Sequence, residues 1–251
     1  MFKSSEFNYF IVICILTFFS FLPGLWWLYF GVFPDWFLRE KGVVETVGAS
    51  ACFVAAIVFF SEAICGKKTD GVLKVWLILL AVMSLCVAGE EVSWGQHIFG
   101  FKVPASIRDN NFQREFNLHN SSLIQNVNNF YSLMFMKLLT AYLLLLPIFF
   151  KAFNSLRKPL VFLKIPIPSL YIAIIVFFVK SGLRFNHYAV YGGFSFGDIY
   201  RVGEMYECIM ECCLLILAIE CLLFSRRNIL NVHPQQQVEK MDMILKRVKK
   251  P

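Results

Sequence analysis

The chain has 251 residues, of which 58% are hydrophobic and only 16% are charged, and its formal net charge is +7. About a quarter of the residues of a soluble protein are charged, so this composition excludes a water-soluble globular domain. The 28 phenylalanines favour the same conclusion, because a lipid-facing surface accommodates them. We predict an all-α, polytopic integral membrane protein.

Six apolar stretches approach the roughly 20 residues that a helix needs to cross the hydrocarbon of a bilayer. The first is too long for a signal-peptide core and lacks a cleavage site, so we expect it to stay in the protein, with a bend at Pro23 and Gly24. We predict a bundle of about six transmembrane helices within residues 1–225, at Asn8–Phe33, Val43–Cys65, Gly71–Gly89, Phe130–Phe150, Ile167–Leu183 and Ile199–Phe224.

Lysines and arginines indicate the orientation, because short cytoplasmic loops carry an excess of them. Six spans place both termini on one side, which holds fifteen basic residues against eight on the other. We therefore expect a bacterial inner-membrane protein with both termini in the cytoplasm. The tail, residues 226–251, has seven basic and two acidic residues with apolar residues at helical spacing. It predicts an amphipathic anchor on the anionic leaflet, and nucleic acid is not an expected partner.

Ionisable residues from distant segments fall at one height. A helix rises about 1.5 Å per residue, so they lie roughly 20–30 Å above the cytoplasmic interface, in the outer third of the bilayer. Charges at that depth are costly unless they face the bundle interior or a wet cavity. Lys137 and Lys180 are the nearest counter-ions by depth, and a salt-bridge network that only joins the helices is the alternative. The carboxylates of this layer are Glu45, Glu90, Glu91, Glu204, Glu207 and Glu211.

The outer loop, residues 100–129, alternates polar side chains with Phe112, Phe116 and Leu118. This period of two predicts an extended segment with one polar and one aromatic face. Such a segment does not lie naked in hydrocarbon, so we expect it to fold over the bundle mouth with its polar face toward a cavity. An amide network that only caps the helices is the alternative. The polar residues are Asn111, Gln113, Glu115, Asn117, His119 and then Asn120.

Carboxylates and imidazoles at one membrane face suit general acid–base catalysis, or a zinc or non-haem iron site with mixed nitrogen and oxygen ligands. Arginines and lysines there also suit phosphate or sulfate recognition. We predict His119 and His187 as ligands of a divalent metal such as zinc. The predicted catalytic residues are Glu90, Glu91, His119, Glu204 and Glu207. The predicted substrate-binding residues are Glu45, Trp94, Gln96, Asn111, Gln113, Glu115, Asn117, Asn120, Arg184 and Arg201.

Two motifs, Gly-Glu-Glu-Val-Ser-Trp-Gly-Gln at 89–96 and Asn-x-Gln-x-Glu-x-Asn-Leu-His-Asn at 111–120, resemble the signature of a poorly characterised bacterial family of polytopic membrane proteins. That resemblance carries no activity with it. The pair Glu90 and Glu91 is similar to the start of CAAX-protease-like intramembrane metalloproteases, but no arginine follows it. The ceramidase-like superfamily uses outer histidines around zinc, usually on seven helices, whereas this chain has six expected spans.

Three functions fit the sequence. The first is a membrane-embedded enzyme that acts on a membrane lipid or a lipid-linked headgroup from the outer, periplasmic side. The second is a proton- or ion-coupled transporter or a flippase accessory, although the carboxylates lie outside the midplane and no inverted repeat is visible. The third is a structural subunit of a membrane complex, in which the charged layer would dock a partner.

Overall fold

The computed structural model describes residues 4–30, 42–66, 69–111, 114–118, 121–122, 130–190 and 196–226. Over these residues the protein is all-α, and a single antiparallel bridge joins Asn111 to Ser121. The long helices are α1 (Ser4–Phe30), α3 (Val43–Cys65), α4 (Gly71–Glu91), α11 (Leu170–Val190) and α12 (Phe196–Arg226). The fourth predicted span combines α8 (Phe130–Thr140), the π-helical turn η2 (Ala141–Leu145) and α9 (Leu146–Ala152). The short elements are η1 (Ser93–Gly95), α5 (Gln96–Phe99), α6 (Ala105–Arg108) and α10 (Asn154–Phe162).

Every predicted span coincides with a helical segment, and the bounds predicted for α3 are those observed. Helix α1 runs through Pro23 and Gly24, where a bend was predicted. In the described part of the chain, three stretches are long and apolar enough to cross a membrane, namely Val43–Cys65, Gly71–Glu91 and Phe135–Ala152. The all-α prediction is confirmed. Of the predicted tail, residues 226–251, only Arg226 is described, as the last residue of α12.

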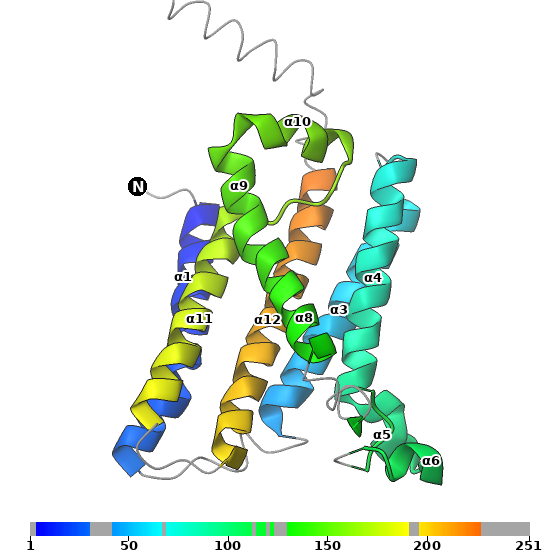
Figure 1. The fold of residues 1–251 in the computed structure, drawn as a ribbon. Coiled ribbons are helices and arrows are strands. Elements are labelled where there is room, and N and C mark those ends of the chain that lie inside the picture. Colours follow the sequence, from blue (N-terminus) through cyan, green and yellow to red (C-terminus); the bar gives the residue numbers. More distant parts are fainter. Residues whose placement is uncertain are drawn as a thin grey trace, which may run out of the picture.

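The long helices run alternately up and down the bundle (Figure 1). The start of α1 and the end of α12 therefore lie at one end of the molecule, where α10 also lies. The starts of α3 and α12, the end of α4, and the short helices α5 and α6 lie at the opposite end. We call this second end the motif end, because the motif at residues 89–96 lies there.

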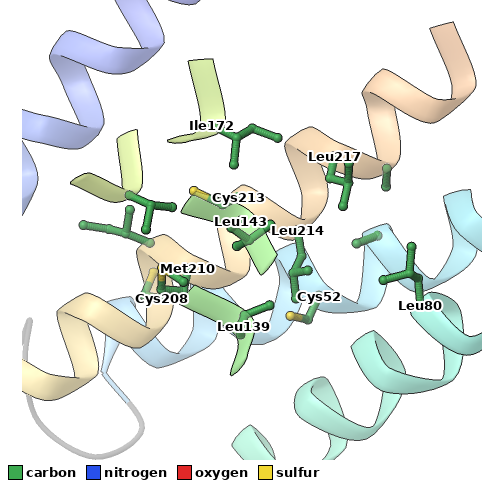
Figure 2. Close-up of a cluster of buried hydrophobic side chains, with 14 of the residues drawn as sticks. Cys52, Leu80, Leu139, Leu143, Ile172, Cys208, Met210, Cys213, Leu214 and Leu217 are labelled. Atoms are coloured by element: carbon green, nitrogen blue, oxygen red, sulfur yellow. The ribbon is translucent and has the colours of Figure 1, made fainter. Parts of the chain in front are cut away.

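Helix α12 is the centre of the fold, and it packs against α1, α3 and α11. Its buried side chains Met210, Leu214 and Leu217 lie in one hydrophobic cluster with residues from α3, α4, α8, η2 and α11, part of which Figure 2 shows. Burial of such apolar side chains is the main favourable contribution to helix packing in water, whereas close fit replaces it in lipid. The partners labelled in the figure include Cys52, Leu80, Leu139, Leu143 and Ile172.

Helix α3 presents small residues to its neighbours, which lets backbones approach closely. A Cβ added at Gly48 would overlap Oε2 of Glu211 and stand 3.2 Å from the Cα of Cys208, both on α12. The missing side chain of Gly48 therefore makes the space that the Glu211 carboxyl occupies. The other small buried residues of α3 are Ala49, Ala51, Cys52, Ala55, Ala56 and Ala63.

We predict that Gly48→Ala lowers the free energy of unfolding by about 1–3 kcal/mol, because the new methyl group displaces the Glu211 carboxyl and part of α12. The measurement is the thermal midpoint of the detergent-solubilised protein. Gly203→Ala is the matched control, since a Cβ at this α12 position meets nothing within 4 Å. Equal midpoints for the two variants would show that the close contact is unimportant.

Candidate functional site at the motif end

The chain turns sharply after α4. Ser93, Trp94 and Gly95 have φ values of 46°, 52° and 79°, so three consecutive residues adopt the left-handed conformation. This conformation is sterically unfavourable for non-glycine residues, which adopt it only where the surrounding structure holds them in it. The turn directs the Trp94 indole back onto α4, where a Cβ at Gly89 would stand 2.9 Å from the ring. Gly89 is thus the residue type that lets the indole lie flat against the helix.

Glu90 joins the two sequence motifs. Its Oε1 accepts a hydrogen bond from Trp94 Nε1 at 2.6 Å, and its Oε2 accepts one from the backbone amide of Leu118 at 2.6 Å. Gln96 acts in the same way, because its Oε1 accepts the backbone amide of Phe116 at 2.7 Å. The first motif therefore supplies hydrogen-bond acceptors for two backbone amides of the irregular second motif.

A buried polar network lies between the motifs. Ser93 Oγ donates to Glu115 Oε2 at 2.6 Å, and Asn117 Nδ2 lies 3.2 Å from Ser93 Oγ and 3.4 Å from Glu115 Oε2. Asn111 Nδ2 donates to both oxygens of Asn117 at 2.8 Å, and its Oδ1 accepts the amide of Glu115. All four side chains are buried. These buried polar groups are hydrogen-bonded to one another, which makes this region rigid.

The predicted alternation is present in the burial pattern, with Glu115 and Asn117 buried while Arg114 and Leu118 are exposed. The segment is nevertheless not extended throughout, because Arg114 has φ 59° and its amide donates to Asn111 O in a tight turn. The polar side chains of Asn111, Glu115 and Asn117 face the η1 turn. These side chains form a buried network, and whether it binds a substrate or only caps the helices is a question for the variants below. Gln113, His119 and Asn120 lie outside the described residues.

A cluster of carboxylates lies beside the motifs, contributed by α4 and α12. Glu91, Glu207 and Glu204 all act electrostatically on the carboxyl of Glu211, with Glu91 the strongest. Glu211 is 4% exposed, whereas Glu91, Glu204 and Glu207 are half-buried. Residues predicted to share a height therefore do come together in space. Glu45 lies in the first turn of α3, three residues before Gly48, and like the others it takes part in an interaction.

The two lysines predicted to neutralise these carboxylates, Lys137 and Lys180, have other neighbours. Lys180 on α11 has its ammonium 5.7 Å from the ring centre of Tyr206, and the charges that act on it are those of Arg184 and Lys137. The ion pairs within the described residues are Arg108 with Asp109 and Lys164 with Asp70. Among the described residues neither lysine forms an ion pair with these carboxylates, and their role as counter-ions stays a prediction.

The positions of the predicted histidine ligands are not described, because His119 and the side chains of His97 and His187 lie outside the described residues. The side chain of Arg201 also lies outside them. Among the described side chains, no three potential ligands from histidine, cysteine, aspartate and glutamate are grouped as a metal site. Zinc stays a prediction. Ser93 was not singled out from the sequence, although it stands inside the first motif and is the donor that links it to Glu115.

No protein-family model matches the chain, and neither a curated protein nor a solved structure is similar to it. The resemblance of the two motifs to a bacterial membrane family stays a prediction. The contacts between these motifs are therefore the best guide to what the protein does.

We predict that Ser93→Ala makes the outer loop about tenfold more sensitive to trypsin, because Glu115 loses its short hydrogen bond while staying buried. The measurement is the initial rate of cleavage after Arg108 and Arg114 in the folded protein, read by mass spectrometry. Ser50→Ala is the control, since that exposed hydroxyl donates only to Thr46 O within α3. Matching rates in the two variants would argue against the network.

Proposed function

We propose that this chain is a six-span inner-membrane enzyme, with both termini cytoplasmic, that acts on a lipid or lipid-linked headgroup at the outer membrane face. The observation that carries the proposal is the cluster of Glu91, Glu204, Glu207 and Glu211 beside the interlocked motifs. Two helices that are far apart in the sequence each contribute carboxylates to it. Charges placed so far from the cytoplasmic end are retained in membrane proteins chiefly for function.

A group of carboxylates in a poorly hydrated setting holds protons as well as charges. A protonated carboxyl beside an ionised one is the pair that general acid–base catalysis uses. In our proposal Glu91 takes the proton from the attacking hydroxyl, while Glu204 or Glu207 donates a proton to the leaving oxygen. Glu90 is a positioning residue, because both of its oxygens hold the motifs together. His119, which follows the anchored Leu118, is proposed as a further acid, base or ligand.

We expect Glu91→Gln and Glu204→Gln, and also His119→Ala, each to lower the activity about 100-fold or more, because each removes a proton-transfer group. The measurement is rescue of a deletion strain, together with mass spectrometry of its membrane lipids. Asp109→Asn is the control, because this exposed carboxylate also lies on the outer loop but pairs with Arg108. If all three variants fold and rescue the deletion strain as well as the wild-type protein does, the catalytic proposal is refuted.

A second candidate function, a proton-coupled carrier, is favoured by two carboxylates at the opposite end of the bundle. Glu62 on α3 and Glu220 on α12 are 5% and 3% exposed, and both act electrostatically on Cys221. Glu220 accepts the backbone amide of Ser169, whereas Oε1 of Glu62 is buried and accepts no hydrogen bond from the described residues. Polar groups inside the bundle toward the cytoplasm are a feature of proton pathways.

If the protein is a carrier, Glu62→Gln should abolish proton-driven solute uptake by reconstituted vesicles while leaving the folded protein intact. The glutamine keeps the shape of the side chain but neither releases nor binds a proton at neutral pH. Wild-type vesicles without a pH gradient provide the baseline. Uptake that is absent from wild-type vesicles, with the lipid changes of the previous experiment present, would favour the enzyme over the carrier.

A further inference from the structure

Three cations gather on α8 and α11, in the half of the bundle nearer the motif end. Lys180 and Arg184 are one turn apart on α11, and Lys137 on α8 is close enough to act on Lys180 together with Arg184. Among the described residues, no carboxylate acts on Lys180. None of the three forms an ion pair among the described residues. Like charges at i and i+4 destabilise a helix, so an anion bound between these cations would stabilise the arrangement.

The basic group is held in place and is reachable from the side of the bundle. The Lys180 ammonium lies 5.7 Å from the centre of the Tyr206 ring, which attracts a cation through its electron-rich face. The Tyr206 hydroxyl is bonded to Thr140 Oγ1 at 2.8 Å, and this contact joins α12 to α8. Lys137 and Arg184 are exposed, while Lys180 is half-buried. An anion in the surrounding membrane thus has direct access to the group.

The depth of the group fits a lipid headgroup. Arg184 lies six residues before the end of α11, roughly 9 Å along the helix, and Lys180 roughly 15 Å. Long basic side chains at such depths extend toward the headgroup region. A phosphate is the headgroup component that offers several acceptor oxygens and a full negative charge to lysine and arginine together. Tyr206 and Glu207 are neighbours on α12, so the basic group and the carboxylates flank the same turn.

We propose that Lys137, Lys180 and Arg184 bind the phosphate of a lipid headgroup from the outer leaflet, which places that lipid beside the carboxylates of α12. The inference rests on the proposed function and names its substrate class, a phosphate-bearing lipid. The phosphate enters laterally between α8 and α11. Its charge offsets the repulsion among the three cations, and its headgroup lies next to the turn that carries Glu207.

The test is binding of phosphatidylglycerol to the full-length protein in detergent, measured by native mass spectrometry. Diacylglycerol with the same chains is the phosphate-free comparison. We expect Lys180→Gln combined with Arg184→Gln to weaken phosphatidylglycerol binding about tenfold or more, because two charged donors are lost. The charge-conserving pair Lys180→Arg and Arg184→Lys should bind within about threefold of wild type. The basic tail is present in every variant, so its contribution cancels.

Lys102→Gln combined with Arg108→Gln is the matched control, since it also removes two basic residues of the outer side, both exposed. The proposal is overturned if this control loses as much affinity as the Lys180 and Arg184 double variant, or if the double variant binds like wild type. Equal binding of diacylglycerol would overturn the phosphate as the recognised group. Displacement of the lipid by millimolar inorganic phosphate would overturn the lipid as its source.

The two proposals fail in different ways. Glu91→Gln should bind phosphatidylglycerol as wild type does, because Glu91 is not among the groups that act on Lys180. A Glu91→Gln protein that rescues the deletion strain, with lipid binding lost in the Lys180 and Arg184 double variant, refutes catalysis and keeps the lipid site. An inactive Glu91→Gln protein, with lipid binding unchanged in the double variant, refutes the lipid site and keeps catalysis.

Discussion

The close approach of α12 to α3 at Gly48 is the contact on which the remaining arrangement depends. A carboxyl group occupies the space that a side chain would have filled, so the two helices meet backbone to side chain at this level. Because Glu211 points toward α3, the rotation of α12 about its own axis is fixed, and so are the directions of its other side chains. Tyr206 meets Thr140 of α8, and Met210 and Leu214 fill the core. Gly48 therefore fixes the rotation of α12, and with it the directions of both Glu211 and Tyr206, the residue that Lys180 contacts.

Adjacent glutamates at the end of α4 have different surroundings because consecutive helical residues project about 100° apart. Glu90 faces the returning chain and holds Trp94 and Leu118, whereas Glu91 faces α3 and α12 and acts on Glu211, Cys52 and Cys208. The turn at Ser93 and Trp94 reverses the chain, so that Trp94 reaches Glu90 while Glu91 faces the other helices. The pair thus couples a rigid folded loop to the carboxylate cluster through neighbouring positions of one helix.

Hydropathy and helix rise were enough to predict the helices and the gathering of carboxylates, because both depend on position along an axis. Rotation about that axis is a separate variable. Depth alone therefore paired Lys137 and Lys180 with the glutamates, while the structure places the Lys180 ammonium over the Tyr206 ring and Lys137 near Lys180. In the outer loop, the alternation showed which residues share a side, and the polar side was expected to face inward, but the residues that it would contact were not predicted. The loop contacts Ser93 and Gln96, about twenty residues away, whose part in the packing no local pattern reveals.

The π-helical turn at Ala141–Leu145 has a consequence for how this chain tolerates changes in length. A turn with i to i+5 hydrogen bonds contains one residue more than the α-helix around it, so α8 and α9 follow different registers on its two sides. Tyr142 fastens this turn to the carbonyl of Pro166, just before α11. Deleting one residue within it would restore an ordinary helix and keep both flanking faces in place. Elsewhere in the bundle, a one-residue deletion would rotate an entire helix face by about 100°.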